Sequence, residues 1–182
     1  MWPALSAGAR HRILFATALG FSDGILTALM LAAGRLWVGD TIPLDLTLRI
    51  AAAGALSGLA TLFLAEYARL RLEMSRAAAQ LNLATPNRLI SSALGRAILE
   101  EATGTAMLSA LCSFLGALIP LLTAPLAPGV PAVPVAAALA ALAALGSTLG
   151  RVLGGRLVLW ALALVGTGVV IAAMGIWLNV LG

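Results

Sequence analysis

Five long apolar runs constrain what this chain can fold into. Each run is long enough to cross the hydrocarbon core of a bilayer as an α-helix, which takes about twenty residues. The runs cover residues 13–33, 46–67, 97–122, 133–149 and 157–180. Of the 182 residues, 62% are hydrophobic and 10% are charged, whereas a soluble domain carries about 25% charged residues. The sequence therefore predicts an all-α membrane protein, a single domain of five transmembrane helices.

The segments between these runs are short. Pro43 precedes the second run, where its missing N–H costs nothing. Residues 68–96 are expected to form a short cytoplasmic linker. Its first part continues the second helix through Gln80, and a turn follows at residues 85–87. Residues 123–134 contain four prolines, which predicts a short stiff loop and excludes helix there.

The basic residues predict the topology. All eleven are arginines, and nine of them lie in the N-terminus, the 68–96 linker and residues 150–156. The opposite side has only Arg35 and Arg49. Cytoplasmic loops carry the excess of positive charge, so the N-terminus is predicted to be cytoplasmic and the C-terminus outside. The arginines form no basic patch interleaved with aromatic residues, so nucleic acid is not an expected partner.

Asp23 is the one acidic residue deep inside an apolar run. It lies ten residues into the first run, about 15 Å from its start and near the bilayer centre. Inserting an ionised carboxylate at that depth costs roughly 2.5–3.5 kcal/mol of free energy. Acidic residues found there are therefore first interpreted as functional. The alternative is a protonated aspartate that bonds to a neighbouring helix. Thr27 and Met30 share its helical stripe, and the three could offer hard and soft ligands to a metal such as Fe²⁺, although Met is also a common packing residue.

Further carboxylates are predicted at the cytoplasmic edge. They are Glu66, Glu73, Glu100 and Glu101. Together they could form a funnel for cations below Asp23. Three of them have a simpler explanation. Glu66 could pair with Arg69 or Arg10 at the interface. Glu100 and Glu101 could complement the positive end of the helix dipole at the start of the third span.

Little else in the chain can do chemistry. Cys112 is the only cysteine and His11 the only histidine, so there is no disulfide framework and no Cys/His metal motif. Phosphate-binding and catalytic-triad patterns are absent as well. We therefore expect neither an enzyme nor a bound cofactor.

Four short motifs resemble the vacuolar iron transporter (VIT) family. "SDGILTALMLAAG" resembles the family's first-helix motif, in which a DG pair opens a stretch that ends in AG. "FLAEYARLRLE" resembles its second-helix GEY motif, and "LSALCSFLGALIPLL" resembles its third-helix pattern of SF, then GA and a proline. "LVGTGVVIAAMGIWLNVLG" is similar to its glycine-rich fifth helix. The resemblance covers nearly the whole chain.

The resemblance implies a homodimeric transporter that exports Fe²⁺ or Mn²⁺ from the cytoplasm in exchange for protons, with the first helices at the dimer interface. Asp23 matches the family's aspartate in the translocation path, and Glu66 matches the glutamate of the GEY motif. Leu62 stands where the family usually has methionine, and Ala65 replaces the motif glycine. The glutamate-rich cytoplasmic metal-binding domain of the iron-transporting branch is missing, as in the short members of the family.

These departures keep a second function open. The chain could be a degenerate homologue that does not transport and serves as a membrane scaffold or partner subunit. The alanine- and arginine-rich composition without lysine is typical of a GC-rich bacterial genome, which predicts the bacterial plasma membrane as the location.

Overall fold

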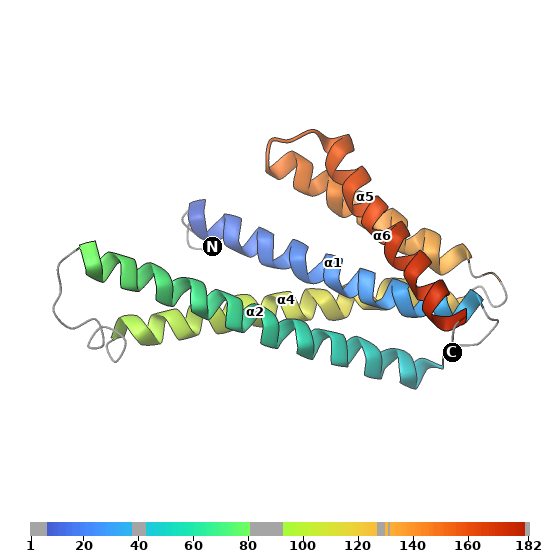
Figure 1. Cartoon of the computed structure of the whole chain (residues 1–182), viewed down its shortest axis with the longest axis horizontal. Helices are drawn as coiled ribbons and strands as arrows, with labels where there is room; N and C mark the ends of the chain where they lie inside the picture. Colours follow the sequence, from blue (N-terminus) through green and yellow to red (C-terminus); the bar gives the residue numbers. More distant parts are fainter. Residues whose placement is uncertain (1–6, 38–42, 81–92, 127–129, 131, 181–182) are drawn as a thin grey trace, which may run out of the picture.

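The computed structural model describes residues 7–37, 43–80, 93–126, 130 and 132–180. These residues form helices, shown in Figure 1: α1 (Ala7–Trp37), α2 (Leu44–Gln80), α4 (Ala93–Leu126), α5 (Ala132–Val152) and α6 (Leu157–Val180). All five are long and apolar enough to cross a membrane. The prediction of an all-helical chain with five such helices is confirmed, and each predicted span falls within one of them.

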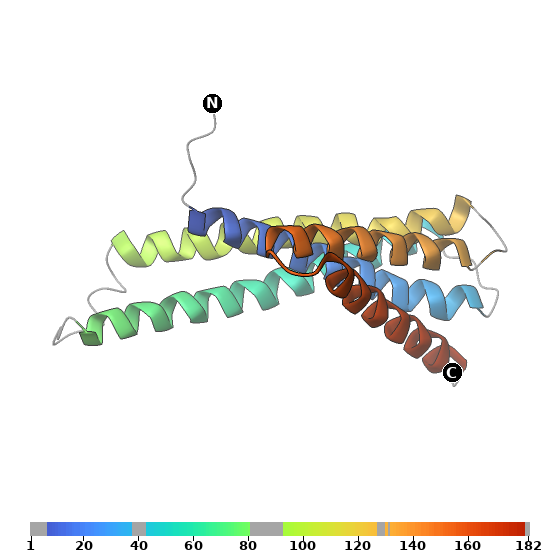
Figure 2. The same ribbon diagram turned by 90° about the horizontal axis from the view of Figure 1, so that it is seen from above.

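The helices run alternately up and down along the long axis of the molecule (Figures 1 and 2). The end of α2 and the start of α4 lie together at one end, and the start of α1 lies further in along the same direction. The α5–α6 turn lies nearer the middle of the long axis. The end of α6 lies near the opposite end. The end of α2 and the start of α4, which carry Arg76 and Arg96, therefore lie at the same end of the bundle.

The α5–α6 turn is built by glycines. Gly154 has a φ of 65°, which only glycine adopts without a steric cost. The N–H of Gly155 donates to the carbonyl of Gly150 at 2.9 Å, and the N–H of Gly154 donates to that of Arg151 at 3.4 Å. This pair of bonds is a Schellman motif, which ends α5 by satisfying its last carbonyls.

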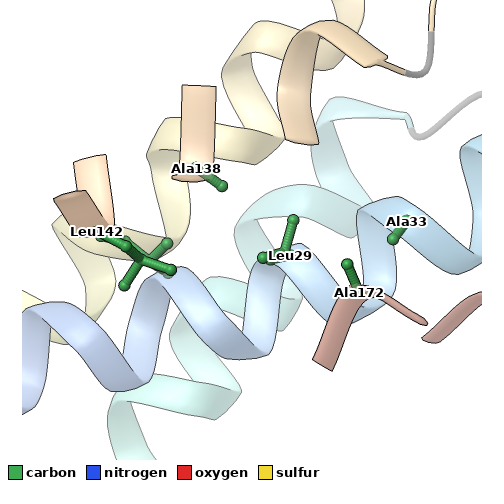
Figure 3. Close-up of a cluster of buried hydrophobic side chains, with 6 residues drawn as sticks. Leu29, Ala33, Ala138, Leu142 and Ala172 are labelled. Carbon is green, nitrogen blue, oxygen red and sulfur yellow. The ribbon is translucent and has the colours of Figure 1, made fainter. Parts of the chain in front are cut away.

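One core cluster lies on the side of α1 that α5 and α6 cover. Ile25, Leu29 and Leu142 have no exposed surface. Figure 3 shows Leu29 of α1 beside Ala138 and Leu142 of α5, with Ala172 of α6 close by. A second cluster joins α1 to α2 and α4 through Ala28, Ala51 and Leu121, which are at most 1% exposed. Asp23, Thr27 and Met30 form an exposed side of α1.

α1 and α4 approach each other closely through small residues. A Cβ atom added to Gly20 would overlap the backbone of Ser109, and one added to Gly24 would overlap that of Ser113. On α4, a Cβ at Gly116 would come within 2.5 Å of the Phe21 carbonyl oxygen. Small residues spaced four apart allow such backbone contact between membrane helices.

The extension of α2 beyond Tyr67 packs against the start of α4. Leu70 of α2 is 6% exposed and forms a cluster with Ile98 and Ala102 of α4. The predicted continuation through Gln80 is confirmed, because the helix ends at that residue. The predicted turn at residues 85–87 lies outside the described residues.

The expected proline loop at residues 123–134 is wrong at both of its ends. α4 continues through Pro125 to Leu126, and α5 begins at Ala132 with Pro134 in its first turn. Pro134 fits there because first-turn N–H groups have no partner within the helix. Ala124 is 6% exposed, so packing in the last turn of α4 favours helix over the local preference of proline.

Apolar side chains cover much of the outer surface. Leu56 of α2 is 73% exposed, and Val158 and Leu162 of α6 are 67% and 61% exposed. A soluble monomer rarely exposes so much contiguous apolar surface. Five apolar helices with an apolar outer surface are typical of a multi-pass membrane protein.

Candidate functional site

Asp23 lies near the middle of α1, on the side that faces α2 and α4. Its side chain is exposed. The Ser113 hydroxyl of α4 donates a hydrogen bond to its Oδ2 over 3.5 Å, which is long for an O–H···O bond. On α2, a Cβ atom added to Gly58 would lie 3.3 Å from the same oxygen. Three helices therefore meet around this carboxylate, but they hold it only weakly.

The close contact between α1 and α4 positions this group. Gly24 follows Asp23 directly and touches the backbone of Ser113. Ser109 and Ser113 are 4% and 2% exposed and face α1. A larger residue at position 24 would separate the two helices and carry the carboxylate away from its serine partner.

A pocket of about 440 Å³ opens beside Asp23, between α1 and α2. Its lining combines leucines with hydroxyl side chains, and includes Leu19, Ser22, Leu26, Ser57, Thr61 and Leu62. Two of these hydroxyls donate to carbonyls of their own helices at 3.0 Å, Ser22 to Leu19 and Thr61 to Ser57. The pocket also includes Ala65, so both departures from the resembled second-helix motif line it.

Thr27 and Met30 are on the same exposed side of α1 as Asp23, but they line a different pocket. That pocket has a volume of about 410 Å³ and is bordered by Arg35 and by Gly175 of α6. Thr27 also lies against α2, where a Cβ added to Gly54 would be 3.9 Å from its methyl group. The predicted stripe of Asp23, Thr27 and Met30 is present on α1. Asp23 lines the first pocket, however, while Thr27 and Met30 line the second.

The two glutamates of α2 are bound by one arginine. Arg69 donates from Nε and Nη2 to the two carboxylate oxygens of Glu66, at 3.0 and 2.5 Å. Its Nη1 reaches Oε1 of Glu73 at 2.5 Å. The simpler explanation for Glu66, an ion pair with Arg69, is therefore the one that the structure contains.

The carboxylates of α4 are not at its start. α4 begins at Ala93 and has no acidic residue in its first turn. Glu100 and Glu101 lie about two turns further in, where the helix dipole has little effect. The prediction that they complement the positive end of the helix dipole is therefore wrong. Glu101 pairs instead with Arg12 of α1, at 2.5 Å. Glu100 is exposed and has no ion pair within the described part of the chain.

The groups that could bind a cation are thus dispersed. Among the described residues there is no cluster of three or more His, Cys, Asp or Glu side chains. Asp23 stands apart from the edge glutamates, three of which have arginine partners. A metal at Asp23 would draw its other ligands from nearby hydroxyl groups, from water or from a second copy of the chain.

No family model matches this chain, and no curated protein matches its sequence.

The residues that surround Asp23 from other helices were not among the predicted site residues. Ser109 and Ser113 on α4 and Ser57 and Gly58 on α2 lie at the site or line its pocket. A signal for the first pair was available. Ser109 and Ser113 are four residues apart, as are Gly20 and Gly24, and this spacing marks tight contacts between membrane helices.

Proposed function

We propose that this chain is a proton-coupled cation transporter, in which Asp23 alternately binds a proton and a cation. The supporting observation is its position. Asp23 lies midway along a candidate span, Arg12–Arg35, beside a pocket, and no described arginine forms an ion pair with it. A carboxylate at the bilayer centre costs roughly 2.5–3.5 kcal/mol, and here no charge within the described chain offsets that cost.

The cargo we propose is a divalent metal, Fe²⁺ or Mn²⁺, exported from the cytoplasm. This follows from the resemblance to the VIT family, in its short form without a metal-binding domain. Asp23 is the exchange site. Glu66, Glu73, Glu100 and Glu101 serve the cytoplasmic approach, and Thr27 and Met30 line the path beyond. Because Arg69 and Arg12 hold three of the glutamates, the metal competes with arginine on its way in.

The transport test uses purified protein in proteoliposomes. Wild type should carry Mn²⁺ and Fe²⁺ faster when a pH gradient is present. Asp23→Asn keeps the size of the side chain but cannot change charge, so flux should fall to that of protein-free vesicles. Asp45→Asn is the control, because this aspartate is exposed at the start of α2, and its flux should equal wild type. Full activity of Asp23→Asn would refute the proposal.

We further propose that the helices span a bacterial plasma membrane with the N-terminus inside and the C-terminus outside. The support is the charge asymmetry of the sequence, because nine of the eleven arginines lie in the N-terminus, residues 68–96 and residues 150–156. Single cysteines added in a Cys112→Ala background, at residue 76 and after residue 182, should react with an impermeant maleimide from opposite sides. A C-terminal cysteine labelled only from the cytoplasm would contradict this topology.

A homodimer with paired α1 helices completes the proposal. The supporting observation is the open side of α1, on which Leu19 is 42% and Met30 is 36% exposed. Cysteines at these two positions should crosslink to their counterparts in a second copy. Cysteines at Ile25 and Leu29, which are fully buried within one copy, should not. A monomer in both mild detergent and nanodiscs would refute the dimer.

One observation favours a second candidate function, a scaffold or partner subunit that does not transport. The edge glutamates that should attract metal are mostly paired with arginines. Under this alternative Asp23 is structural, and its bond to Ser113 stabilises the fold. Wild-type flux equal to that of empty vesicles, together with a loss of stability in Ser113→Ala, would support the scaffold over the transporter.

A further inference from the structure

The pocket beside Asp23 is far larger than one metal ion requires. Its volume is about 440 Å³, within the range of roughly 300–1,000 Å³ that is typical of sites for small organic molecules. Asp23 is the only charged residue in its lining. The walls are otherwise apolar or hydroxyl-bearing, with Leu19 and Leu26 from α1 and Leu62 from α2.

This combination of groups suits a different cation from a bare metal. A divalent ion takes several oxygen or nitrogen ligands to replace its water, and one carboxylate neutralises only half of its charge. A monovalent organic cation is neutralised by one carboxylate and brings its own apolar surface to the leucines. It also replaces one proton at Asp23 for each ion bound, so the charge of the site is the same before and after exchange.

We propose that this pocket binds lipophilic monovalent organic cations, as a further class of cargo exchanged for the proton of Asp23. The inference rests on the proposed exchange role of Asp23 and on the membrane setting. The pocket opens between α1 and α2. Leu19 lines the pocket and also lies on the proposed dimer face of α1, so such a cation enters from the α2 side. It does not pass the arginine-bound glutamates at the edge.

The binding test uses the full chain in nanodiscs with tetraphenylphosphonium as the probe. Wild type should bind it, and Asp23→Asn should weaken binding by about tenfold or more because the charge pair is lost. Triphenylphosphine oxide, a neutral aryl compound of similar shape, should bind weakly and equally to both proteins. Equal binding of tetraphenylphosphonium by Asp23→Asn and wild type would overturn the proposal.

A matched pair of α2 variants tests the place of binding. Ser57→Leu puts a larger side chain into the pocket from an exposed position, and should reduce tetraphenylphosphonium binding at least several-fold. Ala60→Leu enlarges an exposed residue of the same helix outside the pocket lining, and should leave binding unchanged. Both positions are exposed, so both variants should fold. Equal effects of the two variants would overturn the assignment to this pocket.

Transport measurements separate this inference from the proposed function. If Mn²⁺ flux depends on Asp23 while tetraphenylphosphonium does not bind, the inference is overturned and the metal transporter stands. If tetraphenylphosphonium is exchanged for protons through Asp23 without Mn²⁺ flux, the inference stands and the metal cargo is removed. If Ser57→Cys crosslinks two copies and the probe does not bind, a second copy occupies the pocket, which overturns the inference.

Discussion

Replacing Gly116 by alanine tests the close approach of α1 and α4, on which the site depends. The added Cβ would lie 2.5 Å from the Phe21 carbonyl oxygen and 3.3 Å from the Ile25 nitrogen. Non-bonded atoms prefer a separation of about 3.5 Å, so the two helices must move apart by roughly 1 Å. The atoms it meets belong to backbone and cannot rotate away. Overpacking of this kind costs about 1–3 kcal/mol.

Gly104 offers a matched control in the same helix. A Cβ added there meets no atom within 4 Å, so Gly104→Ala should stabilise the protein by about 0.5–1 kcal/mol through the greater helix propensity of alanine. The free energies of unfolding of the two variants should therefore differ by about 1.5–4 kcal/mol. The substitution is the same in both, and only the surroundings differ.

The assay is equilibrium unfolding in mixed micelles with increasing sodium dodecyl sulfate, followed by the fluorescence of the four tryptophans. Gly116→Ala should unfold at less dodecyl sulfate than wild type, and Gly104→Ala at more. The displacement should also lengthen the 3.5 Å bond between Ser113 and Asp23 and so reduce flux. A Gly116→Ala protein as stable as Gly104→Ala would refute the close contact.

Three other predictions concern ion pairs and burial. Arg12→Glu should lower the free energy of unfolding by less than about 1 kcal/mol, because the Arg12–Glu101 ion pair is half exposed. Adding Glu101→Arg should restore this stability, and no recovery in micelle unfolding would contradict the ion pair. Arg69→Gln frees both glutamates of α2, so half-maximal Mn²⁺ flux should occur at lower metal concentration. An unchanged concentration dependence would count against competition between arginine and metal. Cys112 is 8% exposed and should react slowly with N-ethylmaleimide, whereas Leu111→Cys in a Cys112→Ala background replaces a side chain that is 63% exposed and should react quickly.

The helices could be predicted because their signal is local. Five apolar runs of sufficient length give their number and approximate position, and the lack of a breaker before residue 81 gives the extension of α2. The predicted proline loop was wrong at its ends because the cost of a proline in a helix depends on its position. Pro134 occupies a first turn, where its missing N–H has no consequence. Pro125 sits in a last turn whose neighbour Ala124 is packed, and that packing is not visible in the local sequence.

The candidate site could be predicted only in part, because its other residues come from helices that are distant in sequence. Asp23 is conspicuous by depth alone. Its partner Ser113 is ninety residues away, and identifying it requires knowing which faces of α1 and α4 meet. Glycines and serines four residues apart on both helices mark those faces. The arginine partner of Glu66 was foreseeable, since a residue three positions on lies on the same helical face.

Asp23 differs from the glutamates of α2 and from Glu101 because it has no arginine partner among the described residues. Glu66 and Glu73 have an arginine within three or four residues, and Glu101 has one on the adjacent helix. Along α1 the positions that could reach Asp23 by the same spacing are apolar or hydroxyl-bearing residues, Leu19, Gly20, Leu26 and Thr27. In the proposed transporter, the charge of this carboxylate is offset by a proton or by a cation from outside the described chain. Under that proposal the occupancy of Asp23 responds to both pH and cation concentration, which is the property an exchange site needs.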